Sequence, residues 1–419
     1  LAGAGGGINS SELTEADLTR APTPLGSSAS INFNTATTSS LGLIGSNARI
    51  RIQSYEDKSR SLVNNLIGPW ALTSGVSWEF ASYISNLGVG PLNANGFAGY
   101  DSTTFTLPDP ATPDAFASLN VRTSATVPSL ASIGGTLILN ALTHSNSTLL
   151  FTDPTDTLNL SSGGLLAYGN IGTTAIPGQL TAGGNASSGT VDLYVHRISN
   201  SWGYIYSNIT DNPNGASVRA IFNIAAVGGG WNLLGTANSY TGGTVLNGYA
   251  LRLSGTGYII PRAADPTQGL LITGNSTYNG QGVVLTASNQ IHPDNHVSIS
   301  GNGMLQTGSY NLTLAALNLF NNGGSTGGPT VSGSGTLSLT GSLTLSASTS
   351  PGFSATLSVA KMDLLGNNAF PIAVAPTLIE GVSIAPLQPP LVISSTLSNG
   401  GLLKTGEGLL QLSGTSTFA

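Results

Sequence analysis

The residue types that carry catalysis are sparse in this sequence. The 419 residues include no cysteine and four histidines, and the 18 acidic residues are dispersed along the chain. Without cysteine there are no disulfides, thiolate nucleophiles or zinc–thiolate sites. Enzymes that cleave polysaccharides need clustered carboxylates or basic groups for acid–base chemistry, and no such cluster is evident. The sequence therefore predicts no catalytic residues, no cofactor and no enzymatic activity.

Two short segments contain side chains of the kind that bind metal ions. His292, Asp294 and His296 alternate, which would place them on one face of a strand, but the proline between the first two favours a turn. Asp153 and Asp156 flank another proline, and one pair of carboxylates supplies fewer than the roughly six to eight oxygens that Ca²⁺ takes. An exposed corner and a capped turn are the simpler interpretations, so the sequence predicts no metal site.

The four tryptophans are the candidates for ligand binding. They are Trp70, Trp78, Trp202 and Trp231. Each ring either packs in a core, which is the commoner place for large aromatic side chains, or lies on the surface as a platform on which a sugar ring stacks. The second interpretation makes glycans candidate partners of the chain.

The composition excludes several classes of protein. Only 7% of the residues are charged, and the formal net charge is -6. Nucleic-acid binding is not expected, because neutralising phosphates requires clustered lysine and arginine. A transmembrane helix is not expected, because no apolar run approaches the roughly 20 residues that a span needs. Hydrophobic residues make up 40% of the chain, too many for a disordered polypeptide.

A strand-and-turn unit recurs along the chain. The copies are Gly235-Thr-Ala-Asn-Ser-Tyr240-Thr-Gly-Gly243-Thr-Val-Leu-Asn-Gly-Tyr-Ala-Leu-Arg-Leu253-Ser-Gly255, then Gly274-Asn-Ser-Thr-Tyr278-Asn-Gly-Gln-Gly282-Val-Val-Leu285, and the start of a third at Leu412-Ser-Gly414-Thr-Ser-Thr-Phe418-Ala419. The first two lie about 38–39 residues apart, which corresponds to about two coils of a β-solenoid. Because the sequence stops inside a unit, we expect the natural polypeptide to be longer.

Short segments of alternating apolar and polar residues fill the chain from about residue 131 onward. In Thr336-Leu-Ser-Leu-Thr-Gly341-Ser-Leu-Thr-Leu345, for example, two short strands meet at a Gly-Ser corner. Alternation predicts strands with one face inward, and glycine or asparagine at a corner accepts the left-handed conformation of a tight turn. Sandwiches, barrels and propellers share some of these features. The repeat spacing, strand length and corners favour an all-β solenoid with parallel strands and irregular loop insertions.

Changes in composition divide the chain into five segments. They are an N-terminal lead or cap (1–48), early coils with aromatic and proline-containing excursions (49–130), a regular parallel β-helix (131–365), a proline-rich insertion (366–394), and a resumed, truncated repeat (395–419). Within the lead, residues 11–18 predict a short capped helix and residues 30–33 predict a first strand.

The second and third copies of the unit resemble the autotransporter-associated β-strand repeat. The usual lead-in of that repeat is similar to Gly400-Gly-Leu-Leu-Lys404-Thr-Gly-Glu-Gly408-Leu-Leu-Gln-Leu412, and the segment that commonly follows it is similar to Asn289-Gln-Ile-His-Pro293-Asp-Asn-His-Val-Ser-Ile-Ser-Gly-Asn-Gly303-Met-Leu305. Residues 86–130 and 366–394 do not match the family. The resemblance implies a right-handed parallel β-helix, exported and displayed at the bacterial surface or in its matrix, and it carries over no catalytic residues.

These features predict a structural segment of an exported bacterial surface or extracellular fibre or adhesin, a β-helical stalk or filament without catalytic activity. We expect it to be secreted, extracellular or on the cell surface, and to assemble with copies of itself end to end or side by side. The alternative is a carbohydrate-binding or polysaccharide-cleaving β-helix that uses the tryptophans as sugar platforms. No nucleic-acid partner and no membrane span are expected.

Overall fold

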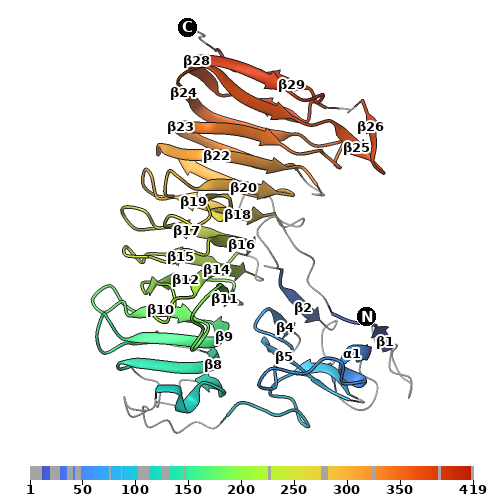
Figure 1. Cartoon of the computed structure of the whole chain (residues 1–419), viewed down its shortest axis with the longest axis vertical. Helices are drawn as coiled ribbons and strands as arrows, with labels where there is room; N and C mark the ends of the chain where they lie inside the picture. Colours follow the sequence, from blue (N-terminus) through green and yellow to red (C-terminus); the bar gives the residue numbers. More distant parts are fainter. Residues whose placement is uncertain are drawn as a thin grey trace. The chain divides into compact units, whose positions relative to one another are not determined.

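A computed structural model shows a chain built almost entirely of β-strands (Figure 1). It describes residues 12–18, 29–34, 41–42, 49–74, 77–85, 87–101, 113–123, 133–145, 148–224, 228–274, 282–322, 327–385 and 388–416. Most of the predicted lead (1–48) and parts of the excursions before residue 131 lie outside these ranges. The chain forms two compact units. The first contains Leu1–Ile198 and Asn212–Ala216, and the second contains Ser199–Asp211 and Ser217–Ala419.

The helices within the described ranges are short. They are α1 (Gln53–Glu56) and the 3₁₀ helices η1 (Pro113–Phe116) and η3 (Pro266–Gln268). None of the described helices has the length and apolar character needed to cross a membrane.

The first unit contains a stack of parallel strands. Its strands are β7 (Asn120–Thr123), β8 (Thr136–His144), β9 (Thr157–Ala167), β10 (Gln179–Ala182) and β11 (Thr190–Arg197). Leu137 pairs with Leu158, which pairs with Leu180, and all three side chains are fully buried. Each coil thus stacks its leucine on the leucine of the next coil, which keeps water out of the interior.

Two small sheets precede these coils in the same unit. One pairs β1 (Glu12–Glu15) with β3 (Arg49–Ile52), and the other contains, in spatial order, β2 (Ile31–Asn34), β4 (Ala71–Ser74), β5 (Glu79–Ile84) and β6 (Gly88–Pro91). The strand β2 confirms the strand expected near residue 31. The helix expected at residues 11–18 is wrong, because Glu12–Glu15 pairs in parallel with Arg49–Ile52 and takes its backbone partners from that strand.

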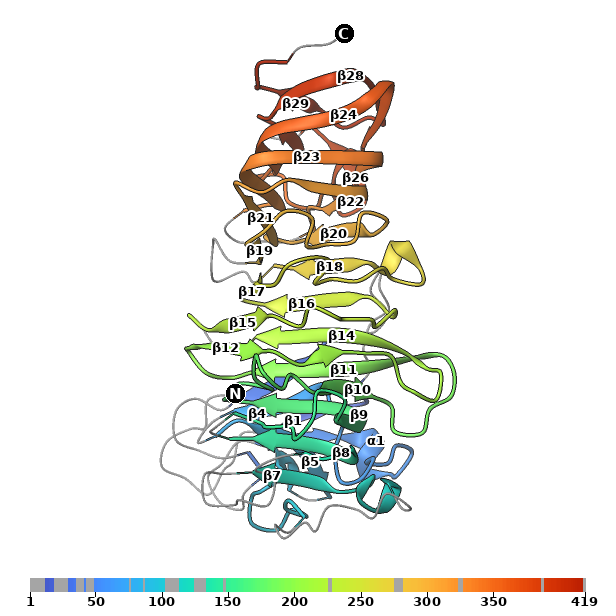
Figure 2. The same ribbon diagram turned by 90° about the vertical axis from the view of Figure 1, so that its left-hand side faces the viewer.

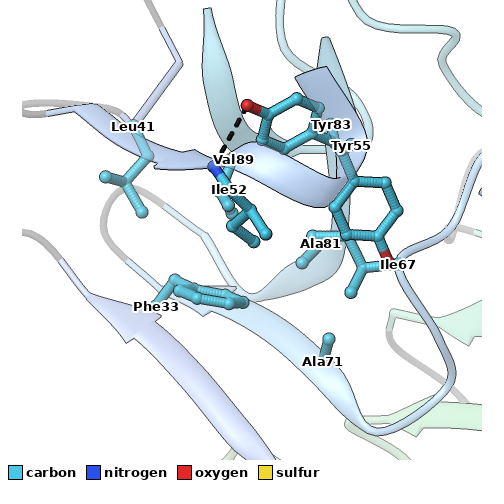
Figure 3. Packing of buried hydrophobic residues seen from close by; sticks show 9 residues of the cluster. All are labelled: Phe33, Leu41, Ile52, Tyr55, Ile67, Ala71, Ala81, Tyr83 and Val89. Atoms are coloured by element: carbon cyan, nitrogen blue, oxygen red, sulfur yellow. Dashed lines mark hydrogen bonds between the residues drawn. The ribbon is translucent and has the colours of Figure 1, made fainter. Parts of the chain in front are cut away.

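The interpretation of residues 49–130 as early coils also differs from the structure. The strands β4, β5 and β6 pair antiparallel in sequence order, because the short turns between them cannot make the crossover that parallel strands need. Among the described strands of this range, β7 joins the parallel stack. Figure 3 shows that the two small sheets share a core, in which Tyr55 and Tyr83 stack with ring centroids 5.2 Å apart and the Tyr83 hydroxyl accepts a hydrogen bond from the backbone N–H of Ile52.

The second unit consists of two stacks of parallel strands, best followed in Figure 2. One stack contains β14 (Ser217–Ile224), β16 (Thr244–Gly248), β18 (Leu270–Thr273), β20 (His296–Ser300) and β22 (Leu312–Phe320). The other contains β12 (Trp202–Ile205), β15 (Gly230–Leu233), β17 (Leu251–Leu253), β19 (Val283–Leu285) and β21 (Met304–Gly308). The unit also contains the two-residue strand β13 (Asn208–Ile209).

The later coils of this unit have longer strands that serve both stacks. These strands are β23 (Thr330–Leu345) and β24 (Ala355–Val374); beyond them, β27 (Leu391–Ile393) and β29 (Leu410–Leu412) continue one stack and β28 (Thr396–Thr405) continues the other. Register shifts within β23 and β24 mark the corners between the two faces of a coil. One such shift lies beyond Ser338, so the predicted Gly-Ser corner interrupts the ladder within one strand.

Inward side chains form continuous columns through these coils. One column passes through Leu251, Val283, Leu305, Val331, Leu357 and Ile393, whose pairing is parallel at every step and whose side chains are all fully buried. Consecutive strands of each stack belong to successive coils, which defines a parallel β-helix. The predicted all-β solenoid with parallel strands is confirmed.

The predicted spacing of the repeated units is wrong. At the aligned positions the first copy forms β16 and the second forms β19, which lie in different stacks, and β17 of the first copy is the strand that pairs with β19. Leu251 pairs with Trp231 on one side and with Val283 on the other, so neighbouring coils differ greatly in length. A fixed number of residues therefore does not correspond to a fixed number of coils. Residues 275–281 of the second copy lie outside the described ranges.

The Gly-Gly turn of the first copy is explained by close packing. Gly243 has φ +93°, and a Cβ at this position would lie 2.1 Å from the carbonyl oxygen of Gln268 in the adjoining coil. The next residue donates its N–H to the carbonyl of Gly269, which starts the parallel pairing of β16 with β18. Glycine is required here both for the backbone conformation and for the approach of the next coil.

The predicted insertion at residues 366–394 is smaller than expected. Its first part continues β24, where Pro371 pairs with Leu403 beside a register shift, so that the missing N–H falls where the ladder is already irregular. Only the antiparallel pair β25 (Thr377–Ile379) and β26 (Val382–Ile384), with its flanking segments, leaves the coils. Proline alone was not a reliable sign of an excursion.

Candidate functional site

In the structure, one predicted sugar platform is a buried tryptophan, and another has an arginine side chain over its ring. Trp231 in β15 is fully buried, so its ring packs in the interior and the prediction of a stacking role is wrong. Trp202 in β12 is partly exposed, but the guanidinium carbon of Arg252 lies 4.5 Å from its ring centroid. A cation over a ring face is a favourable contact, and it occupies the face that a sugar would need.

The other two tryptophans lie in the first unit. Trp78 is partly buried against the hydrophobic cluster that contains Phe80 and Leu166. Trp70 is partly buried against the core that the two small sheets share, and it also lines two cavities. Of the four predicted platforms, Trp70 is therefore the one that the structure places beside open space.

The larger cavity beside Trp70 has a volume of about 270 Å³. Ser161, Ser162 and Asp192 contribute hydroxyl and carboxyl groups to it, and the Tyr194 hydroxyl donates to Asp192 Oδ2 at 3.3 Å. The other cavity, of about 230 Å³, is lined by Arg60 among others. Both are smaller than the roughly 300–1,000 Å³ typical of small-molecule sites, so each would hold little more than a single polar group or ring.

A larger hollow lies in the second unit, on the outer surface of the coils. Its volume is about 560 Å³, within the range of roughly 300–1,000 Å³ that is usual for ligand sites. The lining residues are Asn302, Met304, Gly327, Gly328, Thr330, Gly352, Phe353, Ser354, Thr356, Gln388 and Val392. We call this hollow the coil groove.

The floor of the coil groove is a register column of outward side chains. Met304 pairs with Thr330, Thr330 with Thr356, and Thr356 with Val392, so the floor crosses four strands. These residues alternate with the buried inward column, and all four are partly exposed. Phe353 and Gln388 come from the segments that precede β24 and β27 and form part of the wall. The β-helix thus positions the floor, and the inter-strand segments position the wall.

The first unit also contains a buried carboxylate, whose oxygens accept hydrogen bonds from neighbouring side chains of the protein. Glu79 is fully buried, its Oε1 is 2.7 Å from Arg122 Nη1, and its Oε2 accepts a 2.7 Å hydrogen bond from the Tyr100 hydroxyl. Asn93 and Ser77 donate to the same carboxylate at 3.0 and 2.9 Å. Burial, with Glu79 as a lesser cause, raises the pKa of Tyr100 well above its usual value. This network joins β5 to β7.

His196 is a buried histidine that is likewise hydrogen-bonded to another part of the chain. Its side chain is fully buried, and Nε2 lies 2.7 Å from the carbonyl oxygen of Pro69. Burial lowers the pKa of His196 to about 4, so the ring is neutral near pH 7 and donates Nε2–H to that carbonyl. The histidine therefore connects β11 to the segment that precedes β4.

The two metal-like segments form turns. Arg262 Nε lies 2.9 Å from Asp294 Oδ2, and the Tyr258 ring lies 4.6 Å from the His292 ring. Asp156 accepts hydrogen bonds from the backbone N–H groups of Gly135, Thr152 and Asp153. Within the described ranges there is no group of three or more His, Cys, Asp or Glu side chains that could hold a metal ion.

The coil groove was missed by sequence reasoning for a structural reason. Its floor residues are separated by whole coils, and no local motif connects them. The segment around Ser350, Pro351 and Gly352 signals a loop in the sequence, but nothing in it indicates that Phe353 faces a hollow. The register that aligns the floor depends on coil lengths that the sequence did not give.

Comparison of the chain with family models, with curated proteins and with solved structures finds no match in any of the three.

Proposed function

We propose that this chain is a structural segment of an exported bacterial surface or extracellular fibre or adhesin, a β-helical stalk or filament without catalytic activity. The observation that supports this proposal most directly is the unbroken column of six buried aliphatic side chains in the second unit. Each rung is held to the next by backbone hydrogen bonds and by apolar contact, so the coils form a stiff element that is suited to carry load.

The surface composition also supports an extracellular structural role. Outward positions in β23 carry mainly serine and threonine, and only 7% of the whole chain is charged. Hydroxyl and amide groups keep such a surface hydrated without ions. The resemblance to autotransporter-associated repeats points to the same location, and we propose assembly with further copies, end to end or side by side.

Electron microscopy of cells that produce the protein tests the proposal. Immunogold labelling of intact, unpermeabilised cells should decorate surface material or released filaments. Labelling that appears only after lysis would contradict the surface location. An assay for reducing ends released from a panel of polysaccharides should give no signal, and reproducible release would show that the chain is an enzyme.

A further inference from the structure

The lining of the coil groove has a consistent chemical character. None of its described residues is charged. Its polar groups are the amides of Asn302 and Gln388 and the hydroxyls of Ser354, Thr330 and Thr356, and its apolar groups are led by the Phe353 ring. An ionic ligand would find no opposite charge here. The hydroxyls of Thr330, Thr356 and Ser354 donate to Gly328 O, Ser354 O and Gln388 Oε1 at 3.1, 3.5 and 3.4 Å, so towards a ligand they act as acceptors. A purely apolar ligand would remove water from these oxygens and from the Gln388 amide.

The backbone around the groove excludes recognition of a peptide by strand addition. That mode requires a sheet edge with unpaired N–H and C=O groups. The floor strands β21, β23, β24 and β27 each pair with a strand on both sides. The groove therefore offers side chains rather than backbone, and an occupant must be recognised through hydroxyl, amide and ring contacts.

We propose that the coil groove binds a neutral saccharide. A sugar ring has an apolar C–H face and a rim of hydroxyl groups, which matches one aromatic ring beside amides and hydroxyls. Phe353 provides the stacking surface, while Gln388, Thr330 and Thr356 exchange hydrogen bonds with the rim. Floor residues repeat at about 4.8 Å, the spacing of paired strands, so successive sugar units along the floor meet Met304, Thr330, Thr356 and Val392 in turn. The inference does not depend on the proposed fibre role.

Titration calorimetry with defined oligosaccharides tests this proposal on the full chain. The probes are the neutral hexasaccharides cellohexaose, maltohexaose and mannohexaose, with hexagalacturonate as the charged counterpart. We expect saturable binding of at least one neutral probe and none of the galacturonate. Phe353→Ala should weaken that binding about tenfold or more, and the double variant Thr330→Ala/Thr356→Ala should weaken it several-fold, in line with the loss of a stacking ring or of hydrogen bonds.

A blocking variant and two aromatic controls complete the design. A Cβ at Gly352 meets no atom within 4 Å, so Gly352→Leu starts a side chain in open space at the lining of the groove and should abolish binding. Tyr204→Ala removes an exposed ring elsewhere on the second unit and should bind as the wild type does. No binding of any neutral probe overturns the proposal. Wild-type binding by both Phe353→Ala and Gly352→Leu, or loss of binding in Trp70→Ala, moves the site elsewhere and overturns it too.

Discussion

At the scale of single residues, buried asparagine side chains connect neighbouring segments of the chain through hydrogen bonds to backbone groups. Asn238 donates from Nδ2 to the carbonyls of Gly235 and Ile259, at 2.8 and 2.9 Å, and its Oδ1 accepts from the N–H of Ile209 at 2.8 Å. Asn295 does the same between Ala263 and Pro261. At each site an amide supplies the backbone bonds that a corner cannot make for itself.

Replacing Asn238 with aspartate tests this role without changing the shape of the side chain. The variant loses both donors and places a carboxylate against two carbonyl oxygens in a buried corner. We expect the free energy of unfolding in urea to fall by about 2–4 kcal/mol at pH 7, since buried groups left without partners cost about 1–3 kcal/mol each.

Asn322→Asp is the matched control. Asn322 is exposed, and its Oδ1 accepts from the N–H of Gly301 at 3.2 Å, a bond that a carboxylate retains. We expect a change within about 0.5 kcal/mol, as is usual for surface substitutions. Equal losses in the two variants would show that the corner bonds of Asn238 are unimportant.

His196 gives the stability of the first unit a defined pH dependence. Its folded pKa of about 4 lies below the value of 6.5 for an exposed histidine. Between these pH values His196 is protonated in the unfolded chain but not in the folded chain, so the free energy of unfolding rises with pH in this window. The contribution is complete above about pH 6.5, is lost as the pH falls toward 4, and amounts to about 3 kcal/mol.

His196→Gln removes this titration and keeps an N–H donor for the carbonyl of Pro69. The wild type should lose more stability between pH 7 and pH 4.5 than the variant does, by about 2–3 kcal/mol. Urea unfolding at both pH values provides the measurement. His292→Gln, which changes a partly exposed ring in a turn, should retain the full wild-type loss. The same pH slope in His196→Gln and the wild type would mean that the buried ring is not responsible.

At the scale of elements, the sequence predicted where strands lie better than it predicted which strands pair with one another. Alternation identified the inward leucines of β23, and residues 337, 339, 343 and 345 are indeed buried. It could not say which strand lies above which, because pairing depends on how many residues each coil spends in its corners. For the same reason the repeat suggested equivalent positions for the aligned strands of the copies that start at Gly235 and Gly274, although these strands, β16 and β19, lie in different stacks.

The candidate site was predictable only where one side chain carries the signal. Trp70 was found from its residue type, and it does line cavities, whereas Trp231 looked the same in sequence and is buried. Burial of a ring depends on its position in a coil, which local sequence does not encode. The coil groove depends on register across four strands, so it could not be found without the structure.

Leu357 tests how strongly one rung supports the column. Its side chain is fully buried in β24 between Val331 and Ile393. Leu357→Ala leaves a cavity in an interior that coils above and below cannot easily refill, and we expect a loss of about 3–4 kcal/mol in the free energy of unfolding. The neighbouring Ser358→Ala changes an outward position and should cost less than about 0.5 kcal/mol. Similar losses for the two would contradict the inward and outward assignment.

At the scale of the whole molecule, few charges take part in holding the fold together. Arg262 and Asp294 form an exposed pair, with side chains 57% and 55% exposed, and the pairs Arg60–Asp17 and Lys361–Asp363 are partly exposed. Glu79 and Arg122 differ, because the carboxylate is fully buried and the guanidinium is 31% exposed. Salt screens exposed pairs and barely affects buried ones. The overall stability should therefore depend on one buried pair far more than on the surface charges.

Urea unfolding at 50 mM and 1 M NaCl checks this expectation. The wild-type free energy of unfolding should change by less than about 0.5 kcal/mol between the two salt concentrations, because exposed pairs contribute little at either. Glu79→Gln leaves Arg122 without its anion and should cost about 3 kcal/mol at both concentrations, as removal of one partner of a buried pair does. Arg262→Ala should cost nearly nothing. A wild-type stability that falls steeply with salt would show that surface ion pairs, rather than stacked aliphatic columns and amide corners, hold the coils together.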